Sequence, residues 1–373
     1  MKALLFANTD WYLYNFRLPL AKALRSAGYD VVLLSPPGDY AKRLTQEGFR
    51  WIGFPFSRGV NPLTELATLW RPVGLYRRER PDLVHHFTIK CVLYGGIAAR
   101  CSRAKAIVSS VTGLGHVFIT DSWGNRVLRP VVSLVYRYVF GRSQIIFQNP
   151  DDRNDFFRLA LADERRSHLI RGSGVDTEYF RPSTDARRER PLTVLMVGRL
   201  LREKGVREFV EAAAIVRKQL PGVQFLLAGD SDPGNPSSID PNVVAEWQER
   251  GDVRFLGHRP DIRDLIQAAD LAVLPSYREG MPRSLLEAAA CGVPLVATDV
   301  PGCREIVSNG VNGLLVPPFD SRLLAEAVIE LLGDRERREA MGKRSRAMAC
   351  ELFSEDRVVR ETMAVYTGAF NKN

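Results

Sequence analysis

Two cations follow the apolar run Thr193–Val197. Gly198 allows the backbone to turn tightly at a strand end, and Arg199 and Lys204 then project from a strand-to-helix loop. The free N–H groups of such a loop already favour anions. Arg can bind a phosphate bidentately while Lys supplies a point charge. The pair therefore suits a diphosphate, including one that gains charge as it leaves, and the alternative is a pair of solvated surface cations.

A second segment predicts the start of a helix. An apolar run ends at Pro275, and Pro282 suits the first helical position of a segment that continues to Cys291, where Gly292 and Pro294 stop it. Residues 280–281 would then present backbone N–H groups at the helix N-terminus, which attracts anions.

Two carboxylates accompany this helix. Glu279 stands in the loop before it, and Glu287 lies about a turn and a half into it. Because Leu286 and residues 288–290 leave little polar face around Glu287, its carboxylate needs a partner. A ribose diol could donate two hydrogen bonds to it, and an ordinary solvated helix residue is the alternative.

One pair of carboxylates matches the Asp-x-Asp pattern that can hold a divalent cation. Residues 230–232 read Asp-Ser-Asp and stand in a turn-rich stretch with Pro233, Gly234 and Pro236. Carboxylate pairs are common in turns, and Arg199 and Lys204 already supply positive charge. We therefore expect a surface loop, no metal site and activity that persists in EDTA.

Apolar runs alternate with helical patterns throughout the chain, which predicts βαβ units and parallel sheets. In the first half, helices are expected at 16–27 and 40–46, and strands at 2–7, 31–35, 51–54, 83–86, 106–110 and 145–148. In the second half, strands are expected at 193–197, 224–228, 253–256, 271–274, 295–298 and 313–316. The polar segment 185–191 has the composition of a linker.

The predicted fold class is α/β, with two Rossmann-like, doubly wound domains facing a cleft. A length of 373 residues favours two domains. We expect them at 1–182 and 190–354, with a C-terminal helix at about 355–373 packing back on the first. Ligands of such sheets bind outside the carboxyl ends of the strands.

Charge and cysteine content narrow the class of protein. Residues up to Asp176 carry 25 Lys and Arg against 14 Asp and Glu, whereas the remainder is nearly neutral. A basic half suits an anionic partner. The five cysteines have no CxxC spacing, which argues against disulfides and zinc and favours a cytoplasmic protein. We expect no export signal, since the first apolar run is interrupted at Asn8.

Six segments of the second half closely resemble, in order, the family 4 glycosyltransferases, a large retaining group with the GT-B fold. They read GSGVDTEYFRP, GRLLREKG, VRFLGHRPDI, ADLAVLPS, EGMPRSLLEAAACGVPLVATDVPG and EIVSNGVNGLLVPP. The resemblance implies a nucleotide-diphosphate sugar as donor, with UDP and an N-acetylhexosamine preferred, and no cofactor or metal. It also implies that the leaving diphosphate helps to deprotonate the acceptor, so that no side-chain base is required.

The resemblance also implies roles for particular residues. Arg199 and Lys204 would bind the diphosphate, and Glu279 would bind sugar hydroxyls; these three are the expected catalytic residues. Glu287 would bind the ribose. The other expected donor contacts are Gly198, His258, Arg259, Pro260, Gly280, Met281, Pro282, Ser284 and Leu285.

The first half resembles bacterial transferases that act on undecaprenyl-diphosphate-linked sugars, including those of protein N-glycosylation, O-antigen and capsule. The matching segments are YNFRLPL, HHFTIKCVLYGGIAAR and VSSVTGLGHVFI. Arg17 and Lys90 are candidates for binding an acceptor diphosphate. The expected acceptor and sugar pocket comprises Asn15, Arg17, Lys90, Thr112, Gly113, Gly115 and His116.

This half departs from the family in two ways. It lacks the Gly-Gly that many members place after the first strand, and Val111 and Thr112 stand near a position where several members have a histidine. We therefore interpret His85, His86 and His116 as core or pocket-lining residues rather than catalytic ones.

Residues 70–78 and 123–142 mix aromatic side chains with arginines, a pattern typical of segments that lie on an anionic membrane surface. Helices packed on the sheet with a solvated basic face are the alternative. The predicted enzyme is thus peripheral on the inner face of the plasma membrane, with a polyprenyl-diphosphate-linked acceptor.

Other functions fit the sequence less well. A soluble transferase with a small sugar or sugar-phosphate acceptor remains open. A nucleic-acid-binding protein would suit the basic charge, but no such module is present. An epimerase lacks acid–base residues in the first half, and a dehydrogenase lacks GxGxxG after a strand.

Overall fold

A computed structural model describes residues 1–54, 62–113, 123–183 and 190–371. The chain forms two compact units, one of Met1–Ser173 with Asp356–Asn373 and one of Gly174–Glu355. The boundary after Ser173 precedes the predicted 182, because Val175 N donates to Phe353 O at 2.8 Å and ties this stretch to the second unit. Most of the predicted linker, residues 185–189, lies outside the described residues.

The first unit contains a parallel sheet of seven strands in the order β3-β2-β1-β4-β5-β6-β7. Its strands are β1 (Lys2–Phe6), β2 (Asp30–Ser35), β3 (Arg50–Gly53), β4 (Leu83–Phe87), β5 (Ala106–Val111), β6 (Gln144–Phe147) and β7 (Ser167–Leu169). The order reverses between β1 and β4, which makes the carboxyl ends of these strands the switch point of the sheet. Strand β7 was not predicted, since three residues are too few to show a periodic pattern.

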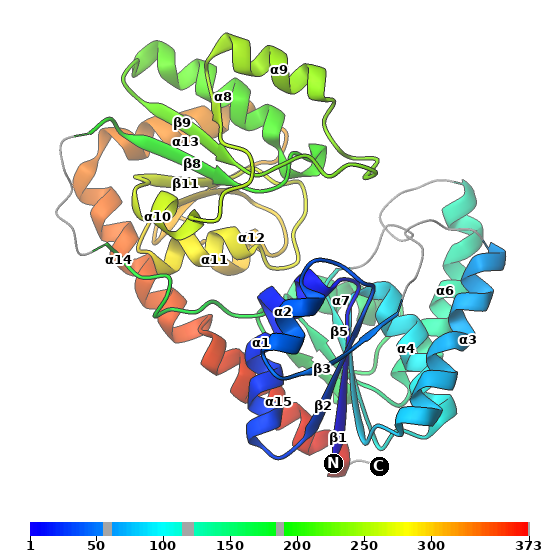
Figure 1. Cartoon of the computed structure of the whole chain (residues 1–373). Helices are drawn as coiled ribbons and strands as arrows, with labels where there is room; N and C mark the ends of the chain where they lie inside the picture. The colour runs from blue at the N-terminus through cyan, green and yellow to red at the C-terminus, as the bar shows by residue number, and fades with distance from the viewer. Residues whose placement is uncertain (55–61, 114–122, 184–189, 372–373) are drawn as a thin grey trace. The chain divides into compact units, whose positions relative to one another are not determined.

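Helices cover both faces of this sheet (Figure 1). They are α1 (Asp10–Ser26), α2 (Ala41–Gln46), α3 (Pro62–Glu79), α4 (Ile89–Ser102), α6 (Trp123–Phe140), α7 (Pro150–Arg158) and α15 (Glu355–Asn371), with a short 3-10 turn η1 (Glu164–Arg166). Strand β1 shows why helices cover both faces, because its side chains alternate between them. Ala3 and Leu5 pack with α1 and α15, while Leu4 and Phe6 pack with α3 and α4.

Helix α1 begins at Asp10, six residues before the predicted start. The side chain of Thr9 accepts a hydrogen bond from Tyr12 N at 3.0 Å and so caps the first turn. Asp10 itself is buried and accepts from the backbone N–H groups of Tyr40 and Ala41 at 2.8 Å each. This carboxylate therefore joins the start of α1 to the start of α2.

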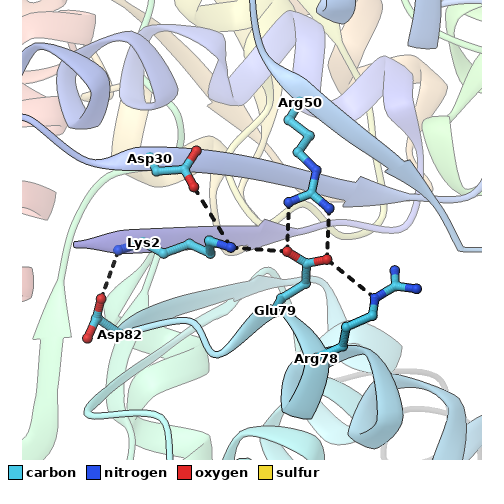
Figure 2. Close-up of polar contacts among 6 residues, drawn as sticks. All are labelled: Lys2, Asp30, Arg50, Arg78, Glu79 and Asp82. Atoms are coloured by element: carbon cyan, nitrogen blue, oxygen red, sulfur yellow. Dashed lines mark hydrogen bonds and ion pairs between the residues drawn. The ribbon is translucent and has the colours of Figure 1, made fainter.

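Charged side chains join the amino-terminal ends of strands β1, β2 and β3 of the first sheet (Figure 2). The buried carboxylate of Glu79, at the end of α3, accepts bidentately from Arg50 at 2.7 and 2.8 Å and from Lys2 Nζ at 3.2 Å. Asp82 accepts from Lys2 N at 2.8 Å, and Asp30 lies 3.8 Å from Lys2 Nζ. The network stands at the opposite end of the strands from the carboxyl edge.

The second unit contains a parallel sheet of six strands in the order β10-β9-β8-β11-β12-β13. Its strands are β8 (Thr193–Val197), β9 (Gln224–Ala228), β10 (Arg254–Phe255), β11 (Leu271–Leu274), β12 (Leu295–Thr298) and β13 (Gly313–Val316). Its helical segments are η2 (Arg202–Lys204), α8 (Val206–Gln219), α9 (Pro241–Arg250), α10 (Ile262–Gln267), α11 (Arg283–Ala290), α12 (Cys303–Ile306), α13 (Ser321–Gly333) and α14 (Arg335–Leu352). Five of these strands match the predicted residues, and β10 is shorter. The order reverses between β8 and β11.

Candidate active site

The loops that follow β8 and β11 meet at the switch point of the second sheet, where ligands of such sheets bind. Lys204 ends the short helix η2 after β8, and its Nζ donates to Glu279 Oε1 in the loop after β11 at 2.5 Å. Ser276 Oγ donates to the same oxygen at 2.7 Å. The side chains of Lys204 and Glu279 are 21% and 11% exposed, so both reach solvent. The structure thus brings together two of the three predicted catalytic residues.

A glycine holds these two loops together. Gly205 has φ 69° and follows Lys204, and a Cβ at this position would lie 2.0 Å from Pro275 O. Tyr277 N donates to Glu203 O at 2.8 Å and adds a direct backbone bond between the loops. Only glycine permits both the left-handed backbone and the close approach, so Gly205 determines where Lys204 lies.

Glycines also place the loop of Arg199 beside its neighbours. A Cβ on Gly229, which follows β9, would lie 1.9 Å from the carbonyl oxygen of Gly198. A Cβ on Gly302 would lie 2.7 Å from Glu279 O and 2.6 Å from Gly280 O. The loops after β8, β9, β11 and β12 are therefore packed backbone against backbone around one edge of the sheet.

Residues 230–236 form a loop of exposed and half-buried residues, and one carboxylate of the Asp-x-Asp pattern pairs with an arginine. Arg199 Nη1 donates to Asp232 Oδ2 at 2.5 Å, and Asn235 Nδ2 donates to the same oxygen at 3.2 Å. This ion pair could not be predicted from the sequence, because β8 and β9 are adjacent in the sheet but far apart in the chain. In the described part of the chain, no three His, Cys, Asp or Glu side chains are grouped to hold a metal ion.

Helix α11 begins at Arg283, with Pro282 as its N-cap residue rather than its first turn. Arg283 Nε donates to Glu287 Oε1 at 2.9 Å, and Arg283 Nη2 lies 3.7 Å from Glu355 Oε1. The partner that the sequence required for Glu287 is therefore this arginine, one helical turn away. Burial raises the pKa of Glu287 above its ordinary value, and the charge of Arg283 opposes that shift.

The predicted nucleobase loop follows β10. Gly257 has φ 63°, and its carbonyl accepts from Gly229 N at 2.9 Å, which places residues 258–260 beside the end of β9. The guanidinium of Arg259 pairs with Asp261 at 2.5 Å. His258 and Pro260 are exposed, and the role of this loop toward a nucleobase stays a prediction.

The first unit places its predicted residues less favourably. Arg17 is 4% exposed, stacks 4.4 Å from the ring centroid of Phe87 and donates to Tyr12 Oη at 2.7 Å. Its Nε has no hydrogen-bond partner among the described residues. Asn15 donates to Trp11 O at 2.9 Å. The roles of Arg17 and Asn15 toward an acceptor therefore stay predictions, because the contacts observed lie within the unit.

The remaining residues predicted to bind the acceptor cluster near two strand ends. Lys90 is half-buried in the first turn of α4, Thr112 and Gly113 follow β5, and residues 115–116 lie outside the described residues. Thr88, between β4 and α4, was not predicted as a site residue and has φ 70°. This backbone conformation is costly for a β-branched residue, and strain of this kind clusters at functional sites.

Both histidines of β4 belong to the core. The ring of His85 forms hydrogen bonds with Tyr366 Oη at 2.6 Å and with Ser110 Oγ at 2.7 Å. The ring of His86 lies 3.1 Å from Tyr76 Oη. Burial lowers the pKa of His86 to about 3 and that of His85 well below its ordinary value. Neither ring carries a charge near neutral pH, which matches the interpretation of these residues as structural.

Comparison with known proteins agrees with this architecture. The sequence profile described as glycosyl transferases group 1 matches residues 180–348, and that of the glycosyl transferase 4-like proteins matches residues 2–149. HepE of Anabaena, solved in complex with UDP, has the same fold with a TM-score of 0.80 at 21% identity, over 99% of this chain and 100% of its own. The two parallel sheets are those of a GT-B glycosyltransferase.

Two curated relatives extend over most of the chain. The N,N'-diacetylbacillosaminyl-diphospho-undecaprenol alpha-1,3-N-acetylgalactosaminyltransferase of Campylobacter jejuni is 30% identical over 367 residues, 95% of each chain. The UDP-Gal:alpha-D-GlcNAc-diphosphoundecaprenol alpha-1,3-galactosyltransferase of Escherichia coli is 26% identical over 294 residues, 74% of this chain and 73% of its own. The chain belongs to the family 4, or group 1, glycosyltransferases, and it is an enzyme that transfers a sugar.

Proposed function

We propose that this enzyme transfers a hexose or N-acetylhexosamine, with retention, from a UDP-sugar to a lipid-diphosphate-linked saccharide. The product would serve bacterial surface polysaccharide or glycoprotein glycan synthesis at the inner face of the plasma membrane. The part of this proposal that concerns the donor rests on one observation, the contact between Lys204 and Glu279 at the switch point of the second sheet. This contact places a lysine that can bind the donor's phosphates beside a carboxylate that can accept hydrogen bonds from the sugar hydroxyls.

The chemistry assigned to these residues is charge stabilisation. The bond from the sugar C1 to the diphosphate oxygen breaks, and the bond from C1 to the acceptor oxygen forms on the same face. The acceptor's proton passes to the leaving diphosphate. Lys204 and Arg199 stabilise the negative charge that the diphosphate gains, which is the main demand on the protein in such a step. Glu279 orients the sugar through its hydroxyls.

The acceptor is inferred from the relatives. Both curated relatives described above have names that specify a diphosphoundecaprenol-linked sugar as acceptor, and one covers almost the whole of this chain. The basic first half suits a diphosphate acceptor. Arg17 supports the same assignment, because it is a buried guanidinium beside the switch point of the first sheet.

A transfer assay tests the proposal. The purified enzyme is given radiolabelled UDP-N-acetylgalactosamine, UDP-N-acetylglucosamine, UDP-galactose or UDP-glucose with a polyprenyl-diphosphate-linked monosaccharide, and the lipid product is separated and its anomeric configuration read by NMR. We expect label in the lipid from one of these donors and the anomeric configuration of the donor in the product. Transfer only to free sugars or sugar phosphates would replace the proposal with a soluble transferase. Inversion at C1 would contradict the mechanism.

A further inference from the structure

We propose that helix α6 docks the enzyme on an anionic phospholipid surface, with its exposed apolar side chains among the headgroups and an arginine-lined hollow beside it that holds a lipid phosphate. This inference rests on the proposed function for its biological purpose, because a lipid-linked acceptor brings the enzyme to a membrane. It names the surface that makes the contact.

Helix α6 has two apolar faces, and one is exposed. Tyr136, Val139 and Phe140 are at most 2% exposed and pack in the core of the first unit. On the other side, Leu134 is 69% exposed and Val131 is 59% exposed. Aromatic residues flank this exposed stripe, with Trp123 at 82% and Tyr138 at 45%. A helix of ordinary surface character would place polar side chains at these positions.

Arginines line the hollow next to this stripe. Its volume is about 580 Å³, and its walls include Arg126 and Arg129 of α6, Arg137 about two turns further along the same helix, and Arg158 and Leu159 at the end of α7. Some of this charge is already oriented, since Arg137 Nε donates to Ala160 O at 3.0 Å and Arg158 Nη2 donates to Asp155 Oδ1 at 2.5 Å. Four guanidinium groups around one hollow suit the phosphate of a lipid headgroup.

The charge of the helix selects a membrane over other partners. Residues 123–140 contain no Asp or Glu. A second copy of the chain, paired through a two-fold axis, would bring these arginines against one another. A nucleic acid would pair with the arginines but leave the stripe of Leu134 and Val131 uncovered. A bilayer interface satisfies both, because interfacial helices combine a basic face with apolar and aromatic side chains. No helix in the described ranges is long and apolar enough to span a bilayer.

Vesicle flotation of the full chain tests this surface. Vesicles of phosphatidylcholine alone are compared with vesicles containing about one third phosphatidylglycerol, a composition that adds a negative surface potential. The first variant changes Val131→Gln and Leu134→Gln together, and the second changes Arg126→Ser and Arg158→Ser. All four side chains are exposed or lie on the rim of the hollow, so both variants should fold, which circular dichroism checks. The matched controls in the second unit are Val311→Gln, at a position 48% exposed, and Arg335→Ser, whose side chain is 79% exposed.

We expect the wild type and both controls to float with the anionic vesicles, and each of the two double variants to bind on the order of tenfold less. Salt should weaken the wild type strongly and the arginine variant less. Flotation of both variants at the wild-type level would overturn the inference, as would a wild-type dimer, measured by light scattering, that the glutamine variant dissociates. Retention on RNA in place of vesicles, lost in the arginine variant, would also overturn it.

A second readout separates this inference from the proposed function. Each variant is assayed on an acceptor whose lipid tail is short enough to dissolve in water. We expect the wild-type rate there, and a loss of rate only when a long-chain acceptor is presented in vesicles. Flotation without transfer to any lipid-diphosphate acceptor would reject the proposed function and leave the docking surface standing. Transfer to the short-chain acceptor without flotation would support the proposed function and reject the docking surface.

Discussion

At the residue scale, the contact of Lys204 with Glu279 makes the two side chains interdependent. Lys204 is both the charge expected to stabilise the leaving diphosphate and the cationic partner of a carboxylate that is only 11% exposed. We expect Lys204→Ala to lower kcat about 100-fold, the usual effect of removing one preorganised electrostatic contact at a reacting group. Steady-state kinetics measure this, with exposed Lys218→Ala as the control. A kcat within twofold of the wild type would remove Lys204 from the mechanism.

The ion pair of Arg199 with Asp232 predicts a competition. A diphosphate that binds Arg199 must replace the carboxylate oxygen now 2.5 Å away. Because the arginine is more than half exposed, the pair contributes at most about 1 kcal/mol. We therefore expect Asp232→Asn to lower the donor KM by up to about fivefold with kcat unchanged. The same assay in EDTA should show full activity for both proteins. Loss of activity in the variant together with loss on chelation, restored by Mg²⁺ or Mn²⁺, would make Asp232 a metal ligand.

The raised pKa of Glu287 predicts how donor binding varies with pH. The carboxylate of Glu287 accepts hydrogen bonds from a ribose diol more strongly when it is ionised, and burial moves its pKa above the ordinary 4.5. As the pH falls toward that raised pKa, protonation should begin earlier than for an exposed glutamate, and the donor KM should rise. Glu287→Gln should have a weaker affinity that varies less with pH. Measuring the donor KM between about pH 5 and pH 8 tests this. Equal slopes in the two proteins would argue against ribose binding by Glu287.

At the element scale, the network around Glu79 holds the amino ends of β1, β2 and β3 to α3 (Figure 2). Hydrogen bonds from Arg50 lower the pKa of Glu79 below its ordinary 4.5. The stabilisation is therefore present above that value and is lost as the pH falls through the lower folded-state pKa. We expect Glu79→Gln to reduce the free energy of unfolding near neutral pH by about 2–3 kcal/mol, since Arg50 is half exposed while Glu79 is buried.

Urea unfolding at neutral and acid pH measures this effect. Glu47→Gln is the matched control, because its pair with Lys22 is far more exposed than the carboxylate of Glu79 and contributes at most about 1 kcal/mol. The difference between wild type and Glu79→Gln should shrink as Glu79 becomes protonated. A difference that stays constant with pH would show that the effect arises from packing and not from charge.

Elements of the second unit were predictable where each strand is a run of buried apolar residues. Leu271–Leu274 and Leu295–Thr298 are uniformly buried, and parallel strands covered on both faces have this pattern. The start of α1 was not predictable from the sequence, because Trp11 and Tyr14 interrupt the helical periodicity. The capping role of Thr9 is visible only in the structure. Local patterns predict elements, whereas caps depend on three-dimensional contacts.

The same distinction between local patterns and three-dimensional contacts applies to the candidate site. Lys204, Glu279 and the residues of α11 were predictable because each stands next to a strand end or a helix start, where ligands bind. The partners of these residues were not predictable. Asp232 reaches Arg199 only because β9 lies beside β8, and Thr88 shows its strain only through its backbone angle.

At the scale of the whole molecule, the chain repeats one architecture twice and divides its charge unequally. Each unit is a parallel sheet with a switch point, and the last helix, α15, returns to the first unit, where Tyr366 binds His85. The predicted donor residues lie in the near-neutral second unit, and the exposed arginines of α6 lie in the basic first unit. Under the two proposals made above, nucleotide recognition would depend on specific contacts and lipid recognition on charge.

The most direct test of the account is a thermal-shift panel with UDP-, GDP- and ADP-sugars, for the wild type and Lys204→Ala. A ligand that binds only the folded state raises the melting temperature, and the shift grows with the logarithm of the ratio of ligand concentration to Kd. We predict stabilisation of the wild type by UDP-sugars alone, and a shift reduced at least by half in the variant. Equal stabilisation of the two proteins by a UDP-sugar would contradict the placement of the diphosphate at Lys204, and a response to GDP- or ADP-sugars alone would contradict the proposed donor.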